Sequence, residues 1–226
     1  MLAAPRIPEL GQRDRFVRRA VKEGRVLTLA DEEMASVPSQ KFPGRTVQLF
    51  WSSPLEAKRW AEALTGNAGL QEISLAAFAS EILPGLRAGK GLAGTDWVAD
   101  PIEAEVDPAD LQLRLKADAL PGYLRTLAAK GEVYLVAGDD GPLLQAITRR
   151  GAELYLLHVF AVRADAERYM KKAGARKIMT DPIADFTAST LPWAAERGHL
   201  VVVEPIPGAG GYESRAEDLR NRLMAV

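Results

Sequence analysis

The sequence predicts an α+β protein built from two copies of one unit, each an antiparallel or mixed sheet with helices packed against it. Blocks of residues recur in one order, 107 to 109 positions apart. The recurring blocks are 24–29 with 131–136, 57–61 with 166–170, 83–84 with 191–192, and 110–117 with 218–225. Both copies read as helix, strands, two helices, strand and helix, an order typical of α+β domains. Because duplicated domains often keep an ancestral dimer contact, we expect the copies to be related by approximate twofold symmetry.

The first copy is expected over residues 12–118, after a flexible tail of residues 1–11. Apolar residues at helical spacing predict its first helix, and Gly24 is placed to end that helix. Ser53 and Pro54 are typical of a helix start. The expected helices are 13–21, 54–65, 73–85 and one that opens at 107–108; the expected strands are 25–30, 46–51 and 91–98, with a weak strand before Pro38.

The second copy, residues 119–226, repeats this plan. Its strands are rich in β-branched and aromatic residues, and its helices show apolar spacing near 3.6 residues. The expected helices are 121–130, 164–172, 181–197 and 213–224; the expected strands are 132–137, 153–160 and 199–204.

Composition excludes several classes of site. The 226 residues include no cysteine and only two histidines, so disulfides, thiolate zinc sites and multi-histidine metal centres are not expected. The net charge of −1 gives no global reason to expect nucleic acid as a partner. No signal-peptide or membrane-length apolar run is present, so we expect no membrane partner and a cytoplasmic location.

The richest glycine segment, residues 207–212, lies between an expected strand and the last helix. Its Gly208, Gly210 and Gly211 could offer backbone N–H groups to an anion, but a flexible connector is the alternative, and no dinucleotide or phosphate-loop pattern is present. Acidic turns follow the first strand of both copies, at 31–33 and 139–140. These could bind a divalent cation or simply be solvated.

The histidines and tryptophans are the other candidates. His158 lies within an apolar strand near the position of Phe50 or Trp51 in the first copy, which indicates packing. Neither it nor His199 has a neighbouring nucleophile pattern, so we expect no catalytic residue. Trp193 replaces Gly85 of the first copy, and we expect Trp97 and Trp193 to face a partner.

The first copy resembles a bacterial family catalogued as domain of unknown function 2750. The likeness is carried by residues 47–57, by the I-x-L-x-x-F pattern at 73–78, and by L-P-G-L at 83–86. It covers most of residues 13–117, whereas the second copy keeps Phe186, Leu191-Pro192 and the final helix, and is more weakly similar to SseB-type accessory domains. The resemblance implies neither an activity nor catalytic residues.

The sequence therefore favours a non-enzymatic module that binds a protein partner, without a cofactor. The alternative is a small-molecule or nucleotide-binding protein, or a small enzyme, with its site between the two copies, since clefts between domains are common ligand sites. The expected state is a monomer with pseudo-dimeric halves or a weak homodimer.

Overall fold

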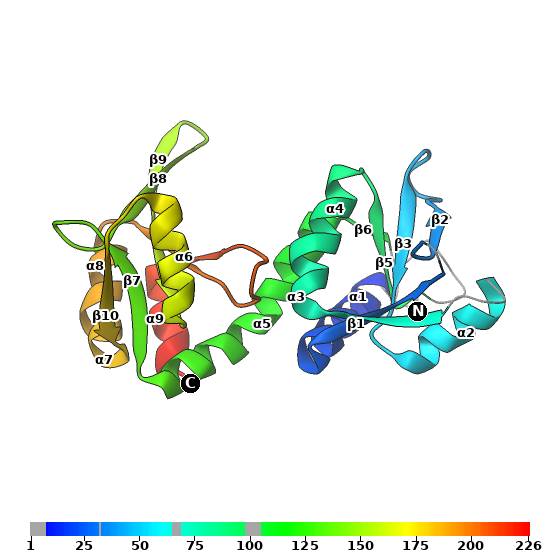
Figure 1. Ribbon diagram of the computed structural model, residues 1–226, viewed down its shortest axis with the longest axis horizontal. Helices are drawn as coiled ribbons and strands as arrows, with labels where there is room; N and C mark the ends of the chain where they lie inside the picture. Colours follow the sequence, from blue (N-terminus) through cyan, green and yellow to red (C-terminus); the bar gives the residue numbers. More distant parts are fainter. Residues whose placement is uncertain (1–7, 32, 65–68, 98–104) are drawn as a thin grey trace, which may run out of the picture. The chain divides into compact units, whose positions relative to one another are not determined.

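The computed structural model in Figure 1 describes residues 8–31, 33–64, 69–97 and 105–226. The chain divides into two compact units, 1–118 with 206–210, and 119–205 with 211–226. The boundary at Asp118 falls inside one helix, α5 (Pro108–Lys130).

The first unit contains a two-stranded sheet and a four-stranded mixed sheet, with helices beside them (Figure 1). Its elements are α1 (Pro8–Glu23), β1 (Arg25–Ala30), β2 (Ser36–Pro38), β3 (Thr46–Phe50), α2 (Pro54–Leu64), β4 (Gly69–Ser74), α3 (Leu75–Ala77), η1 (Phe78–Ile82), α4 (Leu83–Ala88), β5 (Leu92–Thr95), β6 (Glu105–Val106) and the first part of α5. β1 pairs with β4, and the other strands are ordered β2-β3-β5-β6. Leu27 and Trp51 exchange two backbone hydrogen bonds of 2.8 Å, which connect β1 to the end of β3.

The second unit has the same connectivity. Its elements are the end of α5, β7 (Glu132–Ala137), β8 (Leu144–Arg149), β9 (Ala152–Phe160), α6 (Arg163–Ala173), β10 (Lys177–Pro182), α7 (Ile183–Asp185), η2 (Phe186–Thr190), α8 (Leu191–Glu196), β11 (Leu200–Val203), β12 (Tyr212–Arg215) and α9 (Ala216–Met224). The strand order is β10-β7-β9-β11-β12, with β8 also on β9. Replacing each strand by its counterpart in the first unit gives β4-β1-β3-β5-β6 with β2 on β3, so the duplicated fold is confirmed.

Strand registers make the correspondence residue by residue. In the parallel pairs, Gln48 is opposite Ala93, as Leu157 is opposite Val201. In the outer antiparallel pairs, Gln71 is opposite Thr28, as Met179 is opposite Leu135. Equivalent positions in the two units can therefore be compared directly.

The helical segments 75–88 and 183–196 share an unusual feature, a π turn in front of a proline. Leu83 N–H donates to the carbonyl of Phe78, and Leu191 N–H donates to that of Phe186. Proline lacks an N–H and crowds the preceding turn, and a wider π turn accommodates such a disruption. This explains why Pro84 does not end the helix.

The apolar residues that predicted the strands contribute to the hydrophobic cores of both units. In the first unit, Trp51, Leu49 and Val47 of the β3 segment are fully buried with Leu29. In the second, Phe186, Leu157 and Leu219 belong to the larger cluster under β7, β9 and β11.

Three features differ from the sequence predictions. The first helix, α1, begins at Pro8 and so includes residues 8–11, which were expected in the tail. The edge strands β4, β6, β8, β10 and β12 were not predicted, and β4 shows why: every one of its residues except Ile73 is exposed, so it lacks apolar alternation. The two helices expected around residue 120 form the single helix α5, with Pro121 inside it. Buried Leu115 and Leu124 anchor α5 on either side of the proline.

The described helices provide no apolar stretch of the length that a membrane span requires.

Candidate functional site

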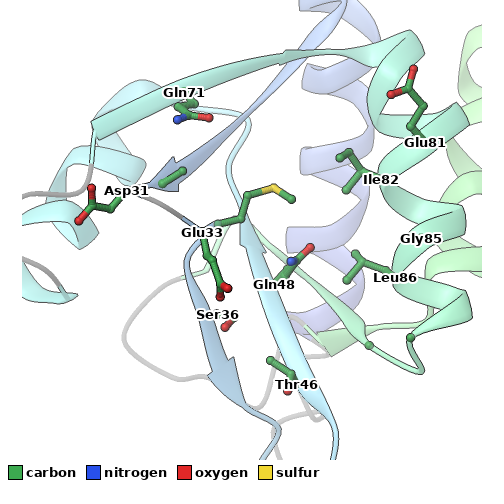
Figure 2. Close-up of a pocket in the computed structure, with 14 residues that line it drawn as sticks. Asp31, Glu33, Ser36, Thr46, Gln48, Gln71, Glu81, Ile82, Gly85 and Leu86 are labelled. Atoms are coloured by element: carbon green, nitrogen blue, oxygen red, sulfur yellow. The ribbon is translucent and has the colours of Figure 1, made fainter.

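A groove lies in the first unit between the β1–β4 strand pair and the β2–β3 strand pair. After Ala30 the chain turns and returns to β3, with Met34 bridged to Ala30 and Ala35 N–H donating to the Leu29 carbonyl at 2.6 Å. β4 follows β1 only as far as Gly69, opposite Ala30. The β1–β4 pair and the β2–β3 pair therefore diverge beyond Ala30. The η1–α4 helix borders the groove between them (Figure 2).

The groove has a volume of about 810 Å³, within the usual range for ligand sites. Met34, Ile82 and Leu86 give it an apolar wall. Figure 2 shows Ile82 and Leu86 extending from the helix toward the strands. The polar wall is supplied by Ser36 of β2, Thr46 and Gln48 of β3, and Gln71 of β4.

The charged residues of the groove all carry the same sign. Asp31 and Glu33 belong to the turn after β1, and Glu81 belongs to η1. Among the described residues that line the groove there is no lysine, arginine or histidine. The site is therefore suited to polar or cationic groups that also offer an apolar surface.

Glycine occupies three positions of the groove lining, Gly85, Gly89 and Gly91, and two of them could carry a side chain. A Cβ atom added at Gly85 would have no neighbouring heavy atom within 4 Å, and the backbone there is not in the left-handed region. A Cβ atom at Gly91 would lie 2.9 Å from Cδ2 of Leu86, a side-chain end that can move. A Cβ atom is therefore accommodated at Gly85 without contact, and at Gly91 its close contact is with a side chain that can move.

The second unit carries large side chains at the equivalent positions. Thr46, Gly85 and Gly91 of the groove correspond to residues that form an aromatic cluster, namely Tyr155, Trp193 and His199. The His199 ring lies 5.6 Å from that of Tyr155 and 5.3 Å from that of Trp193, both edge to face. The Arg197 guanidinium lies 5.3 Å from the Trp193 ring centre.

The polar wall is also replaced in the second unit. The residues equivalent to Ser36, Gln48 and Gln71 are, in that order, Leu144, Leu157 and Met179. Leu157 is part of the hydrophobic core of the second unit, and the other two pack against it. In the second unit, apolar and aromatic side chains thus fill the region that forms the open groove in the first unit.

The two tryptophans expected to face a partner differ in how deeply they are buried. Trp97 is only 1% exposed, and its carbonyl accepts a 3.1 Å hydrogen bond from Nε1 of Trp51, which contradicts the predicted surface role. It is buried because it packs across the core of the first unit. Trp193 is half-buried on the core of the second unit.

The glycine loop has conformational and packing reasons for its composition. Gly208 and Gly210 both have φ of +77°, which disfavours other residues. A Cβ atom at Gly211 would lie 2.1 Å from Cγ1 of Val202. Anion binding at this loop stays a prediction; the nearest cationic atom to a Cβ at Gly210 is Nζ of buried Lys116, at 3.7 Å.

The acidic turns are described except for one residue. Asp31 and Glu33 line the groove, and Glu32 lies outside the described residues. Within the part of the chain that the structure describes, no group of three or more acidic, histidine or cysteine residues could hold a metal ion.

His158 packs against aromatic rings, but its counterpart is not aromatic. The register aligns it with Leu49 and not with Phe50 or Trp51, because His158 is opposite Val202 and Leu49 is opposite Gly94. Its ring stacks on Tyr169 at 4.3 Å, and Nε2 lies 2.7 Å from Oε1 of Gln145. Burial lowers the pKa of His158 to about 4, while the Glu213 carboxylate opposes this shift.

This pKa predicts that acid destabilises the protein through His158. Between its ordinary value near 6.5 and about 4, the unfolded state binds the proton more tightly, so stability falls as the pH falls. Substituting leucine, the residue at the equivalent position in the first unit, should remove this dependence. The difference in free energy of unfolding between wild type and His158→Leu should change by about 1–3 kcal/mol between pH 7 and pH 4, a range that allows for the partial exposure of His158. Urea unfolding at several pH values measures it, and parallel profiles would contradict it.

Asp96, which the sequence interpretation missed, is a buried and hydrogen-bonded ionisable group of the first unit. It is fully buried after β5, with φ of +45°. Its Oδ1 accepts a 2.6 Å hydrogen bond from Ser52 N–H, and its Oδ2 accepts one of 2.8 Å from the Ser52 hydroxyl. Burial raises its pKa, against the effect of the Ser52 bonds. The available signal was its place after β5, whose parallel neighbour β3 is followed by Ser52.

Comparisons with known proteins agree with the sequence resemblance. No curated protein matches the chain. Among solved structures, Tic22 from Anabaena, described as a protein-transport protein, is 13% identical over 92% of this chain and 94% of its own, with a TM-score of 0.27. Tic22 from Plasmodium falciparum is 11% identical over 75% of this chain and 84% of its own, with a TM-score of 0.24. At these TM-scores the likeness carries no functional conclusion.

A family model described as "Protein of unknown function (DUF2750)" matches residues 13–115. The expected membership of the first copy is thereby confirmed, while the weaker likeness expected for the second copy stays a prediction. Residues 13–115 form a DUF2750 domain.

Proposed function

We propose that this protein is a non-enzymatic binding module that holds a segment of a partner protein in the groove of its first unit. The observation that carries the proposal is the difference between the two copies. Groove positions that hold Thr46, Gly85 and Gly91 in the first unit hold mutually packed rings in the second. A fold that is stable with these positions filled has no structural need to leave them empty.

The chemistry of the lining supports binding over catalysis. Its polar groups are hydroxyls, amides and carboxylates. Nucleophilic catalysis by a hydroxyl needs an adjacent base within hydrogen-bond reach, and histidine is absent from the described residues that line the groove. The combination of an apolar wall with polar side chains on the opposite side is typical of recognition sites.

Filling the groove should abolish binding without unfolding the domain. Gly85→Trp introduces the residue that the second unit carries at the same helical position, and Gly85→Ala is the matched control that adds only a methyl group. Because Gly85 has open space and an ordinary helical backbone, both variants should keep or slightly raise thermal stability, by up to about 1 kcal/mol from helix propensity.

Crosslinking from a photoreactive residue at Thr46, at the groove wall, tests this in extracts of the native cell. A partner that crosslinks to wild type and to Gly85→Ala should be lost with Gly85→Trp. Partners retained equally by all three chains would overturn the proposal. A thermal shift caused by a metabolite and abolished by Gly85→Trp would also overturn it, in favour of a small-molecule site.

A further inference from the structure

We infer that the segment bound in this groove is basic, and that a lysine or arginine side chain of the partner enters it. The inference rests on the proposed function and names the chemistry of the partner. Lysine and arginine combine an aliphatic stem with a cationic end, and the groove provides a surface for each part.

The aliphatic stem matches the helical wall. Met34, Ile82 and Leu86 are all partly exposed and face the groove. In Figure 2, Ile82 and Leu86 lie on the helical side of the groove. A linear alkyl chain placed along these three side chains would remove apolar surface from water on both partners.

The cationic end matches the carboxylates around the opening. Asp31, Glu33 and Glu81 make no ion pair with any residue in the described ranges. Two nearby arginines are engaged elsewhere: Arg45 donates to the carbonyls of Lys90 and Gly91 at 2.6 and 2.9 Å, and Arg25 pairs with Glu72 at 2.8 Å. The groove therefore presents net negative charge to an incoming partner.

The second copy of the fold lacks the apolar wall and the carboxylate on the helix, although it keeps an acidic turn. Glu81 and Ile82 correspond to Ser189 and Thr190, and the Thr190 hydroxyl donates to the Asp181 carboxylate at 2.6 Å. The bridge between Ala30 and Met34 has its equivalent between Ala137 and Pro142, so proline replaces the methionine. The carboxylate at the helix and the apolar wall thus occur together in the unit whose groove is open.

Peptides that differ in one side chain test this. The probes are fluorescein-labelled Gly-Ser nonapeptides with a central lysine, arginine, norleucine or glutamate, measured by anisotropy against the full chain. The lysine and arginine peptides should bind, and the norleucine peptide, which keeps a stem without charge, should bind at least about fivefold more weakly, as expected for one exposed ion pair. Binding of the basic peptides should weaken as salt is raised.

Variants assign the binding to the groove. Glu33→Gln and Glu81→Gln should each weaken binding of the lysine peptide by about 2- to 5-fold, and Gly85→Trp should abolish its binding. Asp140→Asn, the same change of charge in the acidic turn of the second unit, is the matched control and should have no effect.

The outcomes separate the inference from the proposed function. If all four peptides bind equally and Gly85→Trp abolishes them all, the groove binds peptides but the basic partner is wrong. If 1,5-diaminopentane binds and no peptide does, the inference also fails. If the peptides bind equally well to Gly85→Trp, the proposed function fails with it.

Discussion

Replacing Trp193 with glycine is expected to lower the free energy of unfolding of the second unit by about 2–4 kcal/mol. The indole packs on the core of this unit, contacts His199 edge to face at 5.3 Å, and lies under the Arg197 guanidinium. Its removal deletes the contacts of the indole with His199, Arg197 and the core, and glycine also lowers helix propensity by about 1 kcal/mol. Partial exposure of the ring keeps the loss below that of a fully buried tryptophan.

Hydrogen exchange locates this loss within the chain. Amides of β9 and β11 should exchange faster in Trp193→Gly, whereas those of β3 and β5 in the first unit should keep their rates. Trp193→Phe, which retains a ring, should recover most of the protection. Unchanged exchange in β11 would show that the Trp193 ring does not stabilise the second unit. The comparison of the two copies would then no longer support the argument that the groove of the first unit is open for binding.

The repeat and the core strands could be predicted because both depend on apolar residues at regular spacing. The segment 46–50 reads as a strand from its composition, and it carries buried Val47, Leu49 and Phe50. The offsets were visible because equivalent elements keep nearly the same separations. The edge strands lack this signal: β4 is almost entirely exposed, and β12 has only alternating partial burial.

The groove could not be predicted because it depends on side chains that are absent. Its lining extends over some 60 positions of the chain, from Ala30 to Gly91, and its opening depends on Gly85. The sequence did show that tryptophan takes the place of this glycine in the second copy, but the interpretation assigned the function to Trp193. In the structure the tryptophan fills its own unit, and the glycine of the other copy marks the candidate site.

Asp96 was missed for a different reason. An isolated aspartate before a tryptophan has many possible roles, and nothing nearby in sequence indicates that Ser52 is its partner. The two meet because β3 and β5 are parallel neighbours, so residues that follow their ends lie together. Such a contact follows from topology and could be inferred only after the strand order was known.

Asp96→Ala is expected to destabilise the first unit by about 2–4 kcal/mol. Ser52 N–H and the Ser52 hydroxyl would both lose their acceptor. Alanine would also have to adopt a φ of +45°, which costs about 1–2 kcal/mol for a residue with a Cβ atom. Denaturant unfolding, with hydrogen exchange of β3 and β5 to identify the unit, measures this loss.

Asp96→Asn distinguishes the hydrogen bonds from the charge. Asparagine tolerates the left-handed region, and its Oδ1 can still accept from Ser52 N–H while its amide donates to the Ser52 oxygen. Burial raises the pKa of Asp96 above its ordinary value of 3.8, so the folded state binds the proton more tightly and wild type loses stability as the pH rises through this range. Asp96→Asn should therefore gain stability relative to wild type between pH 4 and pH 7. A relative loss over the same interval would mean that the Ser52 hydrogen bonds, and not burial, dominate the energetics of this carboxylate.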